Sequence, residues 1–181
     1  MRDLMIDLET LSTRPDAMVI AIGAVGFGPE GLGQEFYAAI RPGTAMGHID
    51  ERTVAWWMGQ SNEARSVFRE DNTDSLSLAA ALQAFGAFVR SFGPDLRIWG
   101  HGSSFDLPII ESAFRACGHP LPWGHRAARD TRTIFDLTGT KVVMPETAKH
   151  NALSDARAQA AAVISAASQL GSHRLWRLGQ A

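Results

Sequence analysis

Three segments near the start of the chain have the hydrophobic patterns of β-strands. Residues 4–9 are apolar at first and then alternate acidic and apolar side chains, and residues 19–27 form a β-branched run typical of a buried central strand. A Gly-Pro-Glu-Gly turn follows, and then a third strand near residues 35–40. The short connections between the three segments predict an antiparallel meander.

Helical periodicity dominates after the third strand. The helices expected next run from an N-cap at Asp50 to Met58, from Ser61 to about Glu70, and from Ser75 through Leu78, Leu82, Phe85 and Val89. The elements expected after them are a strand at 96–99, a helix to Cys117 closed by Gly118, a short strand near 125–129, a short helix capped by Asp130, and a last helix from about Asn151. This order predicts an α/β fold with a mixed five-stranded sheet flanked by helices, in one domain spanning residues 1–181.

Composition narrows the class of protein. The chain has 181 residues, enough to bury one sizeable core, and 45% of them are hydrophobic. Its single cysteine, Cys117, allows no internal disulfide and no cysteine-rich zinc site, which fits a reducing compartment. No signal peptide and no apolar run of about 20 residues is present. We therefore expect a cytoplasmic protein that does not associate with membranes.

Charge is distributed unevenly along the chain. The net charge is −2, but residues 1–123 hold 9 basic and 15 acidic residues (net −6), and residues 124–181 hold 8 basic and 4 acidic residues (net +4). Two solvated faces explain such an asymmetry as well as a binding site does. It is compatible with a short nucleic-acid strand held at one site and not with broad coating of a duplex.

The first strand carries the first candidate for chemistry. Asp7 and Glu9 are two residues apart, so on a strand their side chains share one face, with Cα atoms about 7 Å apart. Both carboxylates can then reach one cation. Two buried acids without a metal or a basic partner are costly, so this strand end calls for a ligand.

Two further motifs hold acids at element boundaries. Asp106 lies where the fourth strand gives way to a helix, a junction at which α/β proteins place ligands, although Ser103-x-x-Asp106 also fits a purely local capping box. His150 and Asp155 are five residues apart and would point about 140° apart on one continuous helix. They converge only if His150 lies in the loop before the helix, with Asn151 as N-cap. For either residue alone, a solvated surface position is the simpler interpretation.

Together, four carboxylates and a histidine match the needs of two-metal phosphoryl chemistry. Two divalent cations about 3.5–4 Å apart clamp the attacking and leaving oxygens of a phosphodiester. Mg²⁺ and Mn²⁺ prefer oxygen ligands, and histidine is the side chain that exchanges protons near neutral pH.

The ordered set DLET, SSFD and HNALSD closely resembles the DEDDh family of 3′–5′ exonucleases in the ribonuclease H-like superfamily. The segment TVAWWMGQSNEAR resembles part of the small stand-alone exoribonucleases and of phage exonuclease-VIII-like members. The resemblance implies a ribonuclease H-like fold from end to end. It also implies a metal-dependent enzyme that removes nucleoside 5′-monophosphates from a 3′ end. We expect RNA to be favoured slightly over single-stranded DNA, a choice that no motif in the sequence decides.

Residue roles follow from the resemblance. Asp7 would bridge two Mg²⁺ ions, for which Mn²⁺ can substitute, Glu9 and Asp155 would hold the first, and Asp106 would support the second, largely through water. His150 would be the general base. Substrate contacts are expected at Thr10, Leu11, Trp56, Trp57, Arg132 and Lys149. Because adjacent residues on a helix diverge by about 100°, only one of the two tryptophans can face the core fully.

The expected partners are 3′ ends of single-stranded RNA or DNA and 3′ overhangs. Dimerisation is common among similar enzymes, which leaves a homodimer open. The alternatives are a ribonuclease H-type endonuclease, which uses similar carboxylates on the same fold, and a non-catalytic nucleic-acid-binding module. A phosphatase with an aspartyl nucleophile fits less well, because Glu9 stands where that chemistry needs a second aspartate.

Overall fold

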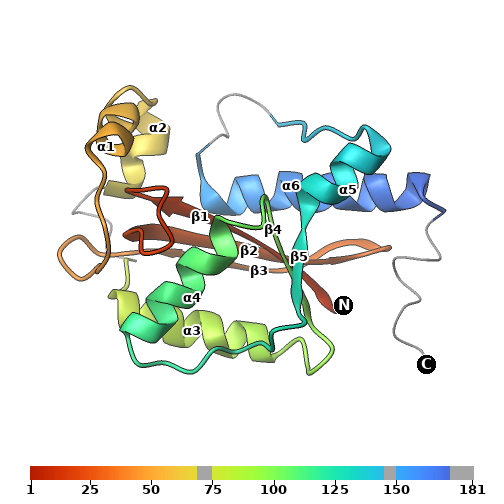
Figure 1. Cartoon of the computed structure of the whole chain (residues 1–181), viewed down its shortest axis with the longest axis horizontal. Helices are drawn as coiled ribbons and strands as arrows, with labels where there is room; N and C mark the ends of the chain where they lie inside the picture. The colour runs from red at the N-terminus through yellow and green to blue at the C-terminus, as the bar shows by residue number, and fades with distance from the viewer. Residues whose placement is uncertain (69–74, 145–149, 172–181) are drawn as a thin grey trace.

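The computed structural model describes residues 1–68, 75–144 and 150–171. Its centre is a mixed five-stranded sheet in the order β3-β2-β1-β4-β5 (Figure 1). The strands are β1 (Asp3–Thr10), β2 (Val19–Gly28), β3 (Gly31–Ala39), β4 (Arg97–Gly100) and β5 (Ala128–Asp130). The first three pair antiparallel, and β1 with β4 and β4 with β5 pair parallel. The predicted α/β class, with a three-strand meander plus two further strands, is confirmed.

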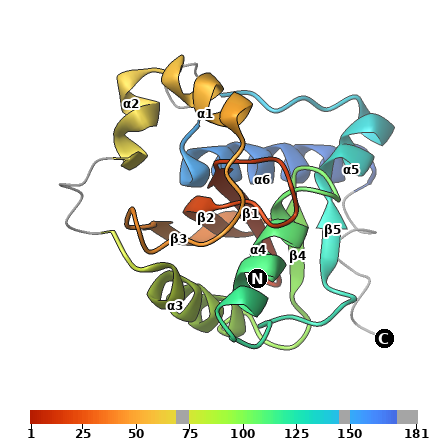
Figure 2. The ribbon, with the colours of Figure 1, turned by 60° about the vertical axis from the view of Figure 1, so that its left-hand side comes forward.

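Helices cover both faces of this sheet. They are α1 (Glu51–Met58), α2 (Asn62–Arg65), α3 (Leu78–Arg90), α4 (Asp106–Ala116), α5 (Thr131–Thr138) and α6 (Ala152–Gln169), with a 3₁₀ turn η1 (Ser66–Phe68). One layer holds α3 and α4, and the opposite layer holds α5 and α6 (Figure 1). Helices α1 and α2 lie beyond the end at which β1 finishes (Figure 2). In the described ranges, no helix is both long and apolar enough to cross a membrane.

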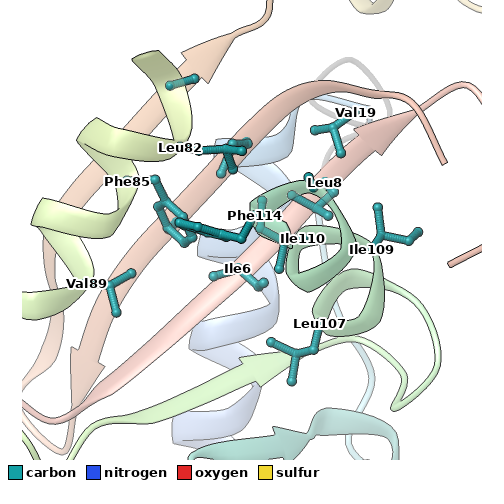
Figure 3. Packing of buried hydrophobic residues seen from close by; sticks show 14 of the residues in the cluster. Ile6, Leu8, Val19, Leu82, Phe85, Val89, Leu107, Ile109, Ile110 and Phe114 are labelled. Atoms are coloured by element: carbon teal, nitrogen blue, oxygen red, sulfur yellow. The ribbon is translucent and has the colours of Figure 1, made fainter. Parts of the chain in front are cut away.

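The central strand β1 contributes to the core on both of its faces. Ile6 and Leu8 point toward α3 and α4, where they pack with Phe85 and Phe114 (Figure 3). Met5 points the other way, into the cluster beneath α6. Because side chains alternate along a strand, Asp7 and Glu9 share the face of Met5, toward α6. Apolar packing therefore anchors both faces of the strand that carries the acids.

Helix α6 lies unusually close to the sheet at Gly23. This glycine pairs with Asp7 across β1 and β2, and a Cβ atom added to it would lie 2.1 Å from the carbonyl carbon of Ala152. Real Cβ atoms do not approach backbone that closely, so any side chain here would push α6 away. The missing side chain lets the first turn of α6 rest directly on β2, near Asp7.

Some boundaries differ from the sequence prediction. The third helix is capped by Ser77 and not by Ser75, because Leu76 is extended and bridges to Ile40 at the end of the meander. The helix after Ser61 tightens into η1 by Phe68, so it does not continue regularly toward residue 70, which is outside the described residues. Strand β3 begins four residues earlier than predicted. The pairing of Leu76 with Ile40, directly after β3, therefore determines where α3 begins.

Candidate active site

Three of the predicted acids meet where β1 passes beneath α6. Carboxylate oxygens of Asp7, Glu9 and Asp155 lie within 4.8 Å of one another. Asp7 and Glu9 come from neighbouring same-face positions of β1, and Asp155 lies in the first turn of α6. An all-oxygen set at this spacing suits a hard divalent cation.

Asp106 joins the same site from the start of α4. Its Oδ1 accepts a hydrogen bond of 3.1 Å from the backbone N–H of Leu8, and its Oδ2 accepts one of 3.1 Å from the backbone N–H of His101. The N-cap of α4 is Phe105, and no side chain of the described residues caps this helix. The capping-box interpretation of Ser103 and Asp106 is therefore wrong: the carboxylate ties α4 to β1 and β4 at the site.

Burial and mutual repulsion strongly perturb these acids. Burial, followed by the charges of Asp106, Glu9 and Asp155, raises the pKa of Asp7 well above its usual 3.8. Burial and the charges of Asp155 and Asp106 raise the pKa of Glu9 to about 8. Burial raises the pKa of Asp106 to about 6, although the backbone N–H donors of His101 and Leu8 oppose this. The ionised forms of these acids are therefore unfavourable in the absence of a counter-charge, and a bound cation would stabilise them.

Gln159 was not predicted and contacts the acid cluster through Asp7. Its Nε2 donates a 2.8 Å hydrogen bond to Oδ1 of Asp7. Its Oε1 is buried and has no hydrogen-bond partner among the described residues. The signal was its position: it follows Asp155 by four residues, so both face the same side of α6. Sequence reasoning passed over it because a helical glutamine is usually solvated.

His150 lies immediately before α6, as predicted. Its φ of +61° makes it the one non-glycine residue with positive φ in the described part of the chain. The next residue, Asn151, caps the helix by accepting a 3.1 Å hydrogen bond from the N–H of Ser154, and its own N–H donates to Oδ2 of Asp155 at 3.2 Å. The left-handed turn therefore takes His150 out of the helical register while Asp155 enters it.

The imidazole of His150 is held against two tryptophans. Its ring lies edge-to-face on Trp56, with centroids 4.7 Å apart, and 6.3 Å from Trp57. Trp57 is buried and donates a 2.9 Å hydrogen bond from its indole N–H to the carbonyl of Thr10, whereas 45% of Trp56 is exposed. Trp57 is thus the core tryptophan and Trp56 the accessible one, as expected for adjacent residues on a helix.

Two hollows flank the acids. The main cleft has a volume of about 600 Å³ and is lined by Asp7, Leu8, Glu9, Thr10, Thr13, Asp50, Arg52, Thr53, Trp56, Trp57, Phe105, His150 and Asp155. The side pocket has about 460 Å³ and is lined by Asp7, Thr13, His101, Ser104, Phe105, Asp106, Arg132 and Gln159. Volumes of this size accommodate a small-molecule-sized ligand. Asp7 is shared by both.

The expected substrate residues are divided among several places. Thr10 and both tryptophans line the main cleft, and Arg132 lines the side pocket. Leu11 is not among the lining residues and packs against the apolar cluster that includes Trp57. Lys149 lies outside the described residues.

Other lining residues were not singled out from the sequence as substrate contacts: Thr13, Asp50, Arg52, Thr53, His101, Ser104 and Phe105. Those on α1 reach the cleft because the backbone N–H of Asp50 bonds to the carbonyl of Leu11, which fixes α1 beside the end of β1. No local motif marks such positions.

Comparisons with known proteins find similarity to exonucleases. A family model described as the 3′–5′ exoribonuclease Rv2179c-like domain matches residues 2–167. An exodeoxyribonuclease of enterobacteria phage T4 is 27% identical over an alignment of 129 residues that covers 64% of this chain. The matched part spans 56% of the phage protein.

Three solved structures illustrate the similarity of architecture. Exonuclease X in complex with 5′ overhanging duplex DNA has a TM-score of 0.54 at 15% identity, covering 93% of both chains. The Mg²⁺- and Mn²⁺-bound form of S. pombe Pop2p scores 0.56 at 12% identity, covering 92% of this chain and 83% of that one. The nuclease domain of 3′hExo, a DEDDh family member bound to rAMP, scores 0.59 at 12% identity, covering 93% and 92%. At such identities the likeness is one of fold, and it confirms the expected ribonuclease H-like architecture.

Proposed function

The chain belongs to the Rv2179c-like 3′–5′ exoribonuclease domain family, and on this premise we propose that it is a metal-dependent exonuclease that shortens nucleic acids from the 3′ end. Family membership confirms the resemblance to DEDDh-type exonucleases. The observation that carries the proposal is the convergence of Asp7, Glu9 and Asp155 within 4.8 Å, with His150 at the same cleft. We further propose that residues 1–181 form one catalytic domain acting in the reducing cytoplasm, in keeping with the lone Cys117.

The residues fit a pair of divalent cations, Mg²⁺ or Mn²⁺. Asp7, Glu9 and Asp155 would hold one cation, while Asp7 and Asp106 would support the other from the side pocket. Burial, together with neighbouring acidic charge at Asp7 and Glu9, raises the pKa values of Asp7, Glu9 and Asp106, so these carboxylates favour a counter-charge. When bound, such cations activate a water molecule and stabilise the charge that develops on the phosphodiester oxygens.

His150 would act as the general base that takes the proton from the attacking water. His150 adopts a left-handed backbone conformation and lines the main cleft, as Asp155 does. Trp56 and Trp57 pack against the imidazole and limit its rotation. A base held in one orientation is more effective, because less ordering is needed in the transition state.

The 3′-terminal nucleotide would occupy the main cleft. Thr10 lies beside the acids, and the exposed part of Trp56 offers a surface on which a base can stack, an interaction worth about 1–3 kcal/mol. Arg132, in the side pocket, together with Lys149 would contact phosphates. Leu11 would support Thr10 from the apolar cluster behind it.

We propose RNA as the slightly preferred substrate over single-stranded DNA, with nucleoside 5′-monophosphates as products. The family description, which names exoribonucleases, supports this order. The phage relative is an exodeoxyribonuclease, and solved neighbours of the same fold hold either duplex DNA or rAMP. Single-stranded 3′ ends and 3′ overhangs of either sugar type are therefore the substrates to compare.

The test is degradation of 5′-labelled RNA, single-stranded DNA and 3′-overhang duplexes with Mg²⁺ or Mn²⁺ present. We expect stepwise shortening from the 3′ end, no degradation in EDTA, and loss of activity in Asp7→Asn. His150→Ala should lower turnover about 10²–10⁴-fold and leave Mn²⁺ binding intact. Asp16→Asn is the matched control, because Asp16 is an exposed acid paired with Arg14.

Two outcomes would contradict the proposal. Cleavage of circular or 3′-blocked substrates at rates equal to those of free 3′ ends would indicate an endonuclease. Full activity in purified, folded Asp7→Asn would remove the acid cluster from catalysis.

A further inference from the structure

Gln159 differs from every other polar group around the acids. It lies one turn after Asp155 on α6, only 7% of it is exposed, and it is a neutral amide among four carboxylates. An amide can donate through Nε2 and accept through Oε1 at the same time. The two ends of this side chain have different surroundings, and both bear on the cation site.

The donor end fixes Asp7. Nε2 donates to Oδ1 of Asp7 at 2.8 Å, which leaves Oδ2 of Asp7 for other partners. A lysine in this place would neutralise Asp7 and compete with a cation, and an acid would add repulsion. A neutral donor orients the carboxylate and leaves its charge available.

The acceptor end is buried and unused. Oε1 of Gln159 has no hydrogen-bond partner among the described residues, although buried carbonyl oxygens nearly always have one. Gln159 lines the side pocket together with Asp7, Asp106 and Ser104, and this hollow of about 460 Å³ has room for water. A water bound to a cation donates both of its hydrogens, so it is the natural partner for an unpaired carbonyl beside carboxylate ligands.

We infer that Gln159 is a positioning residue for the cation site: Nε2 orients Asp7, and Oε1 accepts a hydrogen bond from a water molecule carried by a divalent cation that Asp7 binds. The inference rests on the proposed metal-dependent function. It assigns Gln159 no contact with the nucleic acid and no proton transfer. Such outer groups alter metal affinity strongly because they hold the ligands in place.

The experiment measures Mn²⁺ binding without nucleic acid, by electron paramagnetic resonance of free Mn²⁺. Gln159→Leu removes donor and acceptor and nearly keeps the volume, and Gln159→Met offers an unbranched second variant if the first does not fold. Gln169→Leu is the matched control, since Gln169 is an exposed glutamine on the same helix. We expect the dissociation constant for Mn²⁺ to rise about 10- to 100-fold in the Gln159 variants and to stay unchanged in the control.

Thermal unfolding with and without Mn²⁺ separates positioning from simple packing. A positioning role predicts that Mn²⁺ raises the melting temperature of Gln159→Leu less than that of wild type, each compared with its own value in EDTA. Wild-type Mn²⁺ affinity in a folded Gln159 variant would overturn the inference and leave the proposed function standing. Absence of Mn²⁺ binding by the wild-type protein itself would overturn the proposed function together with the inference.

Discussion

Replacing Glu9 by glutamine should stabilise the metal-free protein at alkaline pH. Only 8% of Glu9 is exposed, and the charges of Asp155 and Asp106 act on it in addition to its burial. Its pKa is raised from 4.5 to about 8, so between those values the carboxyl is protonated in the folded state and ionised in the unfolded state. Unfolding then releases a proton, and the free energy of unfolding falls as pH rises through this window.

The size of the effect follows from the same interval. At about 1.36 kcal/mol for each pKa unit, a rise from 4.5 to about 8 corresponds to roughly 5 kcal/mol. The penalty is absent below pH 4.5, grows with pH, and is constant above about pH 8. Glutamine is neutral throughout and escapes it. For a domain of this size, 1 kcal/mol shifts the melting temperature by about 2–4 °C, so a shift on the order of 10–20 °C is expected at pH 8.5.

The assay is thermal or urea unfolding of wild type and Glu9→Gln at pH 4.5 and pH 8.5, in EDTA and in Mn²⁺. In EDTA the variant should match wild type at the lower pH and exceed it at the higher one. In Mn²⁺ wild type should recover most of the difference, because the cation stabilises the ionised acid. Glu35→Gln is the control, since Glu35 is an exposed partner of Arg157 and its loss should cost under about 1 kcal/mol. Equal pH dependence in wild type and Glu9→Gln would refute the reasoning.

Three further substitutions test how the site is held. Trp56→Ala should release the His150 ring and lower kcat by up to about 100-fold, with little change in folding stability. Trp57→Ala should lower the free energy of unfolding in urea by about 3–5 kcal/mol, because Trp57 is buried. Equal effects of the two substitutions on stability would contradict this division. Gly23→Ala should destabilise the protein by about 1–3 kcal/mol and weaken Mn²⁺ binding, because the new methyl group would displace Ala152. Wild-type stability and wild-type Mn²⁺ affinity in this variant would show that α6 can shift freely.

Local signals in the sequence were sufficient for much of this fold. Asp50, Ser61, Asp130 and Asn151 were predicted as N-caps, and each accepts the expected hydrogen bond from the first turn of its helix. Caps are visible in sequence because donor and acceptor lie within three residues of each other. The alternation that put Asp7 and Glu9 on one face is local for the same reason.

What the sequence left open depends on distant partners. Asp106 sits in a pattern that fits a capping box, yet its carboxylate bonds to the N–H of Leu8, 98 residues away. Ser75 and Ser77 are equally good caps, and pairing of Leu76 with Ile40 selects the second. Gln159 likewise has its meaning only beside Asp7. In each case a contact made by the folded sheet decides between two locally reasonable interpretations.

The hydrogen bond between Gln159 and Asp7 spans 152 residues of sequence, which has a consequence for biosynthesis. All five strands precede residue 131, so they can pair on the ribosome before the whole of α6 has emerged. Until α6 docks, the strand acids meet neither Asp155 nor His150, and the nascent domain has no complete site. We expect hydrolytic competence to appear only with the docking of α6, as amide hydrogen exchange in that helix would report. The long loop closure would thus confine the proposed hydrolytic activity to the fully folded form.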